Sequence, residues 1–428
     1  MFPMHTYKER IADKLLIRKM MGKGAVLIEG LKWCGKTTTA KQIAKSVLNL
    51  GDTTVLNNAM LALQVNPSSL TNGAAPRLID EWQTMPELWD IVRSEVDNRQ
   101  DFGQFILTGS SVPPDIESIH HSGTGRIARL RMRTMSLWES GESNGNVSLA
   151  DLFEGKEAAP QQNMLDLKRI AFLICRGGWP QASFLDGDIA LDQARDYYEA
   201  VYKVDILRMD KVRRNSERAR LIMRSYARFI GQSVSLKKIS EDIKENDNGT
   251  ISYETVSDYI DALKKLFVLE DMPAWNPNLR SKAAIQTSET RYFTDPSIAA
   301  AALYIGPDDL INDLKAAGVF FESLAIRDLR VYADALDGEL FHFRNAVGLE
   351  CDAVLHRRNG TYALIEIKLG GNDQIEKGAL TLNKLAGQIN LDKMPAPSFK
   401  IVLTAVGEYS YRRPQDGVWV VPIGCLRP

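Results

Sequence analysis

The sequence predicts an α/β protein of several domains, and three observations lead to this fold class. First, short apolar strands at 25–28, 77–80 and 104–107 alternate with helical patterns, and small or charged residues follow each strand. Second, the chain has 428 residues, which corresponds to roughly three domains at about 150 residues each. Third, 44% of the residues are hydrophobic and 25% are charged, as in globular proteins that fold in water.

Composition and charge exclude several other classes. No apolar run approaches the roughly 18 residues of a membrane-spanning helix, and residues 1–14 lack the apolar core of a secretory signal, so the cytoplasm is the expected location. The cysteines lie too far apart for a zinc site or a disulfide framework (Cys34, Cys175, Cys351 and Cys425). The net charge is −1, so affinity for nucleic acid would come from local basic segments, at 126–133 and 203–238, unless these are solvated surfaces.

Residues 30–38, GLKWCGKTT, fit the phosphate-binding pattern GxxxxGK[ST] in full and stand between a strand and a helical pattern at 38–47. Glycine lets backbone N–H groups curl around phosphate oxygens, and the helix N-terminus adds the positive end of its dipole. Lys36 would neutralise the β- and γ-phosphates and Thr37 would bind Mg²⁺, so ATP and Mg²⁺ are the expected cofactors. A chance Gly-Lys-Thr turn is the alternative. The expected nucleotide-binding residues are Gly30, Cys34, Gly35, Lys36, Thr37 and Thr38.

Polar residues also follow the other two apolar strands. Asp80 ends the second strand and would hold the metal through water, whereas Glu81 would polarise the attacking water. The third strand is followed by Thr108 and the small residues 109–111, which are able to sense the γ-phosphate. Three strands that end in phosphate-handling residues predict a nucleoside triphosphatase site. The alternative for the two carboxylates is the N-cap of a helix at 82–96.

Five motifs carry a resemblance to a known family: GLKWCGKTTTA at 30–40, LIDEWQ at 78–83, FILTGSS at 105–111, HSGTGRIARLRMRTMSLWE at 121–139 and RGGWP at 176–180. They resemble the bacterial AAA+-type ATPases, related to the STAND and archaeal-ATPase branches, whose C-terminal region is a domain of unknown function with a nuclease-like fold. The resemblance implies a P-loop AAA+-type core at 1–160, a helical lid at 161–217, a winged helix at 218–285 and an α/β PD-(D/E)XK nuclease-like domain at 286–428.

The resemblance also implies roles outside the loop. Arg126 resembles an arginine finger that reaches the γ-phosphate of a neighbouring subunit, with Arg129 as the fallback. A finger supplied in trans implies an oligomer, with a hexameric ring favoured. Pro180, in the Gly-Gly-Trp-Pro stretch at 177–180, resembles a lid residue that contacts adenine. The alternative for 126–133 is a strand whose basic side chains face solvent.

Residues 235–272 have the layout of a winged helix. Ser235 and Ser252 would cap two helices around a turn at 246–249, and 267–272 would form a wing strand. The second helix also carries three carboxylates that are unfavourable beside a phosphate backbone (Glu254, Asp258 and Asp261). DNA reading and a structural role therefore both stay open for this region.

The C-terminal part resembles the PD-(D/E)XK nuclease core. The pattern's catalytic positions are occupied by Glu322, Asp352, Glu366 and Lys368. Asp352 and Glu366 would be metal ligands, because two carboxylates on one sheet face can hold Mg²⁺ while a lysine two residues on orients a water. The proline that names the pattern is absent near Asp352. A retained but inactive fold, in which Glu366 and Lys368 form an ion pair, is the alternative.

The register of the C-terminal hairpin gives an internal test. A two-residue turn would place the carboxylates of Asp352 and Glu366 on different sides of the sheet. A three-residue loop at 358–360 pairs the two residues directly, and it also pairs Ala353 with Ile365 so that the apolar face closes. We therefore predict the three-residue loop.

These features together predict an ATP-hydrolysing AAA+-type ATPase that acts on or with DNA and couples hydrolysis to movement of its nuclease-like domain. Branched DNA is an attractive substrate by fold analogy alone. The alternative is an ATP-dependent regulatory switch whose C-terminal domain is a non-catalytic protein-binding module. A third hypothesis is a plain Mg²⁺-dependent nuclease. No membrane partner is expected.

Overall fold

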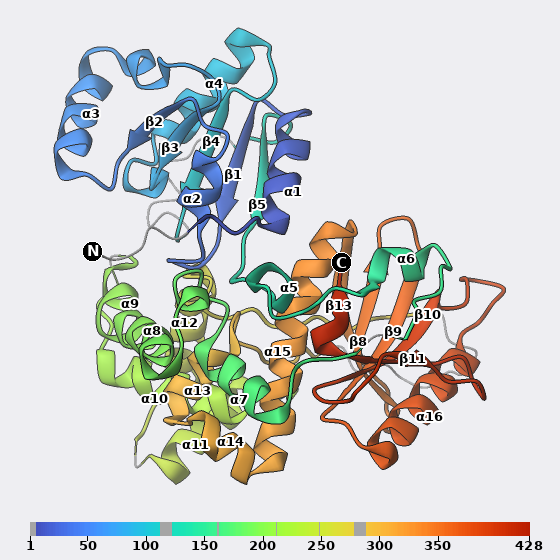
Figure 1. Cartoon of the computed structure of the whole chain (residues 1–428). Coiled ribbons are helices and arrows are strands. Elements are labelled where there is room, and N and C mark those ends of the chain that lie inside the picture. The colour runs from blue at the N-terminus through green and yellow to red at the C-terminus, as the bar shows by residue number, and fades with distance from the viewer. Residues whose placement is uncertain (1–5, 112–121, 161, 211, 248, 278–287) are drawn as a thin grey trace. The chain divides into compact units, whose positions relative to one another are not determined.

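A computed structural model describes all residues except 1–5, 112–121, 161, 211, 248 and 278–287 (Figure 1). The chain divides into two compact units. The first comprises Met1–Thr134, Tyr202–Ser216 and Asp261–Val268, and the second comprises Met135–Val201, Glu217–Ile260 and Leu269–Pro428. The four domains expected from the sequence stay predictions, and their boundary at 285/286 lies outside the described residues. Among the described helices, none combines the length and apolar character needed to cross a membrane.

The first unit is built on a parallel five-stranded sheet in the order β2-β3-β4-β1-β5 (Figure 1). Its strands are β1 (Ala25–Glu29), β2 (Ser46–Asn49), β3 (Arg77–Asp80), β4 (Phe105–Gly109) and β5 (Ile127–Arg131). Strand β4 pairs in parallel with both β1 and β3, so Thr108 lies opposite Ile28 on one side and Asp80 on the other. The residues that follow β1, β3 and β4 therefore meet at one edge of the sheet, which is the edge where open α/β sheets bind ligands.

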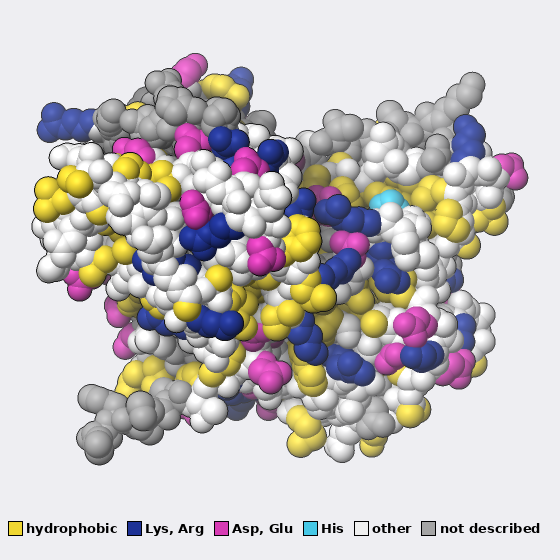
Figure 2. Space-filling view, turned by 90° about the horizontal axis from the view of Figure 1, so that it is seen from above, with side chains coloured by type: hydrophobic (Ala, Val, Ile, Leu, Met, Phe, Trp, Pro, Cys, Tyr) yellow, Lys and Arg dark blue, Asp and Glu magenta, His cyan; other side chains and the backbone are white. Residues whose placement is uncertain are grey.

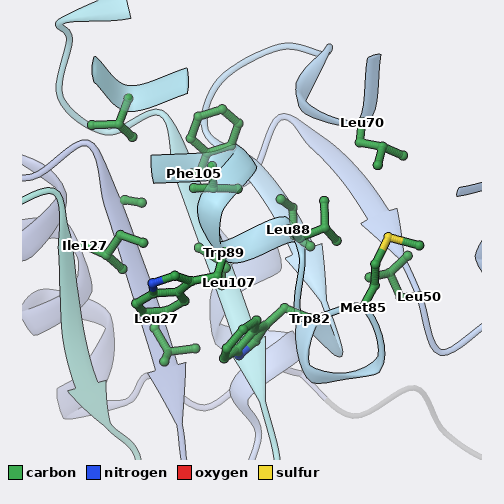
Figure 3. Packing of buried hydrophobic residues seen from close by; sticks show 14 of the residues in the cluster. Leu27, Leu50, Leu70, Trp82, Met85, Leu88, Trp89, Phe105, Leu107 and Ile127 are labelled. Atoms are coloured by element: carbon green, nitrogen blue, oxygen red, sulfur yellow. The ribbon is translucent and has the colours of Figure 1, made fainter. Parts of the chain in front are cut away.

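Helices and an apolar core cover this sheet. The helical elements of the unit are α1 (Ile11–Met20), α2 (Lys36–Lys41), α3 (Thr53–Val65), η1 (Pro67–Thr71), η2 (Trp82–Thr84) and α4 (Leu88–Arg99). A later segment of the chain that belongs to the same unit contains α9 (Ile206–Arg208). Figure 3 shows Trp82 and Trp89 beside Leu27 and Leu107 of the sheet. The two indole rings lie 5.0 Å apart between centroids. The strands of a parallel sheet are covered on both faces, which explains why these strands are nearly continuous apolar runs in the sequence.

Two expected helices differ from the observed elements. The helix expected at 38–47 ends at Lys41, because 46–49 forms the edge strand β2. Pairing of β2 with β3 overrides the helical pattern there. The helix expected at 82–96 is split into η2 and α4, because Pro86 disfavours the helical conformation of the preceding Met85, which has φ −140° and ψ 79°.

The second unit begins with a helical region. Its elements are α5 (Leu137–Ser140), α6 (Leu149–Phe153), α7 (Leu167–Arg176), η4 (Ala182–Phe184), α8 (Gly187–Ala200), η5 (Val201–Asp205), α10 (Ser216–Arg228), α11 (Leu236–Asn246), α12 (Tyr253–Lys265), α13 (Pro296–Leu303) and α14 (Pro307–Asn312). The boundary between the units falls within η5, within α12 and after the first residue of α10. Short strands β6 (Val147–Ser148) and β13 (Leu426–Arg427) pair in parallel, and η6 (Ile423–Cys425) precedes β13.

The two helices expected around the 246–249 turn are present. Ser235 caps α11 by accepting a hydrogen bond from the backbone N–H of Lys238 at 3.3 Å, and Ser252 accepts one from Thr255 at 3.3 Å. The expected wing at 267–272 is not a continuous strand. It forms two antiparallel bridges, Leu269 with Phe293 and Met272 with Thr290. The helices are confirmed, and the winged helix as a whole stays a prediction.

The C-terminal part is a mixed six-stranded sheet in the order β11-β12-β10-β9-β8-β7. Its strands are β7 (Gly338–Arg344), β8 (Glu350–Arg357), β9 (Tyr362–Lys368), β10 (Phe399–Thr404), β11 (Tyr411–Arg412) and β12 (Trp419–Pro422). Helix α15 (Leu314–Ala335) packs against β7, β8 and β9, and α16 (Asn372–Gln388) packs against β8, β9 and β10. Ala353 pairs with Ile365, which confirms the three-residue loop at 358–360.

Candidate functional site

The phosphate-binding loop needs glycine at two positions. Gly30 has φ 154°, and a Cβ atom there would lie 2.0 Å from the carbonyl oxygen of Met132. Gly35 has φ 103° and caps the N-terminus of α2 in the left-handed conformation. Residues with a Cβ atom rarely adopt such positive φ values, so backbone geometry explains both glycines of the pattern.

The lysine of the loop contacts the loop itself. Lys36 is 6% exposed, and its Nζ donates hydrogen bonds to the carbonyl oxygens of Gly30 at 2.9 Å and Leu31 at 2.5 Å. Both acceptors are neutral. The ammonium group therefore lies inside the loop, at the place where the pattern positions it for phosphate.

Hydroxyl groups from helix α2 and from the end of strand β4 meet the carboxylate of Asp80. Thr37 Oγ1 donates to Asp80 Oδ1 at 2.8 Å, and Thr108 Oγ1 donates to the same oxygen. Asp80 is 6% exposed. The hydroxyl of Thr37 and the carboxylate of Asp80 are the hard oxygen donors that Mg²⁺ prefers, so these residues fit the expected metal.

Glu81 has an unusual backbone and a hydrogen-bonded side chain. Its φ of 58° is in the left-handed region, and non-glycine residues in that region concentrate at functional sites. Gln83 Nε2 donates to Glu81 Oε2, and Ser110 Oγ donates to the same oxygen at 3.2 Å. The side chains predicted from β3 and β4 are thus brought together, and Gln83 joins them.

An arginine from the N-terminal segment supports the loop. Arg10 is 5% exposed, and its guanidinium donates to the carbonyl oxygens of Cys34 at 2.8 Å and Arg133 at 3.0 Å. The side chain of Cys34 is buried, so this residue offers a nucleotide its backbone alone. Thr38, the last residue expected to bind nucleotide, is exposed at the start of α2. Sequence reasoning had not singled out Arg10.

Both candidate finger residues are paired with carboxylates of the first unit. The backbone of Arg126 accepts a hydrogen bond from Ala25 N at 3.1 Å, which places it at the amino end of β1, opposite the P-loop edge. Its Nε pairs with Asp97 at 2.8 Å, and Arg129 pairs with Glu29 at 2.8 Å. A finger role would need a neighbouring chain and stays a prediction.

Acidic partners compensate much of the charge in the two basic segments. Besides Arg126 and Arg129, four arginines of the later segment pair with carboxylates within about 4 Å, as ion pairs in proteins do. These arginines are Arg214, Arg220, Arg224 and Arg228. On the face shown in Figure 2, Lys and Arg side chains lie interspersed with acidic and apolar ones. This pairing weakens both segments as binding surfaces for a phosphate backbone.

The Gly-Gly-Trp-Pro stretch is anchored inside the second unit. Gly178 N donates to Asp295 Oδ2 at 2.9 Å, and Trp179 Nε1 donates to Ser297 Oγ at 3.1 Å. Gly177 has φ 72°, and a Cβ there would lie 2.4 Å from Ser297 Oγ. Packing within the unit explains these residues, and contact of Pro180 with adenine stays a prediction.

The C-terminal residues predicted for catalysis also cluster. Lys368 Nζ lies 2.9 Å from Asp352 Oδ2 and 2.7 Å from Glu366 Oε2, so its ammonium group bridges the two carboxylates. The backbone N–H of Ile367 donates to Asp352 Oδ2 at 2.7 Å. Within the described residues, no three His, Cys, Asp or Glu side chains form a ready metal site. The two expected ligands are adjacent, but a lysine stands between them.

Burial changes the protonation of two glutamates in this cluster. Burial raises the pKa of Glu322 to about 8, and the charge of Asp352 adds to the shift. The same two causes raise the pKa of Glu366 to about 8, although its contact with Lys368 acts in the opposite direction. Tyr292 donates its hydroxyl to Glu322 Oε1. Both shifts favour the protonated form of these two glutamates near neutral pH.

Besides Arg10, sequence reasoning missed two residues of these sites. Gln83 stands two residues after Glu81, and its place in the LIDEWQ motif is a usable signal. Tyr292 precedes Glu322 by 30 positions in the chain, and only folding joins them. No local pattern marks Tyr292.

Family comparisons cover three segments of the chain. Residues 22–140 match the family described as "AAA domain". Residues 167–309 and 317–426 match two domains of unknown function, DUF8612 and DUF4143. The first match, together with the loop geometry, supports a P-loop ATPase of the AAA type. The other two matches do not assign a chemistry.

Individual proteins show distant similarity. The uncharacterized proteins Rv2008c of Mycobacterium tuberculosis and Mb2031c of Mycobacterium bovis are each 22% identical over 377 residues, 86% of this chain and 76% of theirs. The Walker-type ATPase PABY2304 of Pyrococcus abyssi is 14% identical with a TM-score of 0.42, covering 68% of this chain and 94% of its own. The Aeropyrum pernix ORC1 protein in complex with DNA is 13% identical with a TM-score of 0.25, covering 68% and 91%. TM-scores this low establish no common arrangement of the whole chain.

Proposed function

We propose that the protein binds ATP at the loop of residues 30–38 and hydrolyses it. The observation that carries this proposal is the convergence of the hydroxyls of Thr37, from helix α2, and Thr108, from strand β4, on one carboxylate oxygen of Asp80 at the end of β3. An anion-binding loop beside a carboxylate is the arrangement that phosphoryl transfer needs, because the loop holds the phosphates and the carboxylate holds the metal. Mg²⁺ held by Thr37 and Asp80 would neutralise charge on the β- and γ-phosphates.

The residues have separate tasks in this reaction. Lys36 would exchange its two neutral carbonyl partners for phosphate oxygens, which is favourable because a charged acceptor makes the stronger hydrogen bond. Glu81 would take a proton from the attacking water. Thr108, at the end of β4 and beside Asp80, would sense the γ-phosphate.

The test is ATP turnover by the full chain in the presence of Mg²⁺. We expect phosphate release in the wild type and a loss of about 100-fold or more in Glu81→Gln, which keeps the shape of the side chain but not its basicity. Glu81→Gln should still bind ATP and retain it through gel filtration. Absence of turnover in the wild type under all nucleotide and metal conditions would overturn the proposal.

We further propose that the ATPase acts with DNA, as a ring-forming oligomer in which Arg126 reaches the next subunit. Support comes from the C-terminal strands β8 and β9, which present Asp352 opposite the Glu366–Lys368 pair as in the nuclease-like pattern. A panel of linear, forked and four-way DNA tests this extension. Turnover should rise with at least one of them, and no response at low salt would remove DNA from the proposal.

A second candidate is a regulatory switch that binds ATP and turns over slowly. The bridging of Asp352 and Glu366 by Lys368 favours it, because an ion pair occupies the place where a nuclease would hold its metal. Size measurement with and without nucleotide separates the two candidates. A stable hexamer favours the motor, and a monomer with retained nucleotide favours the switch.

A further inference from the structure

We propose that Gln83 is a further positioning residue of the hydrolytic site, which orients the carboxylate of Glu81 and offers its own carbonyl to the attacking water. This inference rests on the proposed ATP hydrolysis. Two donors hold Glu81: Nε2 of Gln83 and Oγ of Ser110, the latter at 3.2 Å. Both reach the same oxygen, Oε2. The other carboxylate oxygen carries neither of these bonds and is the one left to face a water.

Hydrogen-bonding chemistry fixes the orientation of the amide. A carboxylate accepts hydrogen bonds and cannot donate them, so the NH₂ end of Gln83 must face Glu81. Nε2 also lies 3.3 Å from Ser110 Oγ, so the three side chains form a closed set. The carbonyl oxygen of Gln83 consequently points elsewhere. It is buried, and it accepts no hydrogen bond from any residue that the structure describes.

The end of strand β4 leaves space for this carbonyl. A Cβ atom on Gly109 would lie 3.2 Å from Gln83 Oε1 and 2.8 Å from Trp82 Nε1. Gly109 stands between Thr108, which bonds Asp80, and Ser110, which bonds Glu81. A buried acceptor without a partner costs free energy, commonly about 1–3 kcal/mol, so its place beside these residues indicates a ligand that donates. Water is the donor that hydrolysis requires.

One water can serve both acceptors. Its oxygen would attack the γ-phosphorus while the bond from that phosphorus to the bridging oxygen of the β-phosphate breaks, and the electron pair leaves with ADP. One hydrogen of the water goes to Glu81 as a proton. The other donates to the carbonyl of Gln83, which fixes the direction of the attacking lone pair.

The test compares Gln83→Met, Glu81→Gln and the double variant in steady-state ATP hydrolysis. Methionine keeps the length of glutamine and removes both hydrogen-bonding groups. We expect kcat to fall about tenfold in Gln83→Met while KM and the ATP dissociation constant change by less than about twofold. In the Glu81→Gln background, the same change should lower kcat by less than about twofold, because Gln83 aligns the carboxylate and the water for a proton transfer that this variant has already lost.

Controls separate positioning from structure. Gln64→Met, at an exposed site of α3, should match the wild type. Should Gln83→Met fail to fold, Ser110→Ala removes the second donor to the same oxygen and should show the same split between kcat and KM and the same lack of effect on Glu81→Gln. If Gln83→Met keeps the wild-type kcat, or lowers kcat by the same factor in the wild type and in Glu81→Gln, the role of Gln83 is overturned while the hydrolysis proposal stands. A wild type without turnover overturns the hydrolysis proposal and this inference together.

Discussion

The P-loop site and the C-terminal cluster each centre on a lysine, but the two lysines face opposite kinds of acceptor. Lys36 donates to two neutral carbonyl oxygens of its own loop, at 2.9 and 2.5 Å. Lys368 lies between two carboxyl groups, 2.9 Å from Asp352 and 2.7 Å from Glu366. These partners leave the charge of the first ammonium uncompensated and compensate that of the second.

The difference teaches that neighbours, and not a sequence pattern, set what a lysine can attract. An ammonium with neutral partners still attracts a polyphosphate, and the exchange gains a charged acceptor. An ammonium held by Asp352 attracts an anion weakly, and it also repels a divalent cation from the same carboxylates. The P-loop is therefore prepared for its ligand, whereas the C-terminal cluster must first move Lys368.

Replacing each lysine in turn gives the largest contrast. We expect Lys36→Ala to lower ATP turnover by about 10³-fold, since the loop loses the cation that stabilises charge on the transferring phosphoryl group. Lys368→Ala should leave turnover per folded molecule within about twofold of the wild type. Phosphate release measured on both variants checks this. An equal loss of turnover in both variants would show that the C-terminal cluster takes part in ATP hydrolysis.

A third charged cluster has the opposite arrangement to that of Lys368: one carboxylate lies between two cations. Glu142 faces two arginines, Arg176 at 2.7 Å and Arg169 at 2.8 Å. Burial acts to raise the pKa of Glu142, but the two guanidinium groups outweigh it and lower the pKa below the ordinary 4.5. We expect Glu142→Gln to destabilise the second unit by about 3 kcal/mol near neutral pH, because Arg176 is 2% exposed and loses its counter-charge.

The pH dependence of that loss has a definite sign. A carboxyl whose folded pKa is lowered contributes stability above its unfolded pKa, and the contribution disappears as pH falls through the folded value. The wild type and Glu142→Gln should thus differ fully at neutral pH and converge below about pH 4.5 in urea unfolding. A difference that stays constant down to acid pH would mean that packing, and not charge, causes the loss.

Much of the P-loop unit follows from local sequence, and the exceptions come from pairing at a distance. The loop, its glycines and the residues after β3 and β4 are set by short patterns, so the sequence predicts them. The helix expected at 38–47 is wrong beyond Lys41, because β2 forms by pairing with β3, some 30 residues later. A helical pattern in an edge segment cannot reveal such a partner.

The C-terminal cluster divides in the same way. Its hairpin register is predicted correctly, because alternation of side chains allows one pairing that closes the apolar face. The hydrogen bond from Tyr292 to Glu322 and the position of the Lys368 ammonium depend on how helix and sheet pack. No spacing in the chain encodes either contact.

Removing the charge of Lys368 tests whether the C-terminal carboxylates can hold a cation. We expect Lys368→Met to cost about 2 kcal/mol in unfolding free energy, since Asp352 and Glu366 lose their shared donor. Mg²⁺ or Mn²⁺ should then raise the melting temperature of the variant more than that of the wild type, because the ion takes the place of the ammonium. An equal metal response in both proteins would show that the cluster is a structural ion pair only.

The loop of the C-terminal hairpin gives the smallest expected effect. Gly360 has φ 87°, and a Cβ placed there meets no atom within 4 Å, so Gly360→Ala would add backbone strain without a clash. We expect a loss of about 1 kcal/mol in unfolding free energy and no change in ATP turnover. In Gly30→Ala, by contrast, the new Cβ would lie 2.0 Å from Met132 O, so turnover should fall. If Gly360→Ala costs as much stability as Lys368→Met, the three-residue loop fixes the register more strongly than the ion pair does.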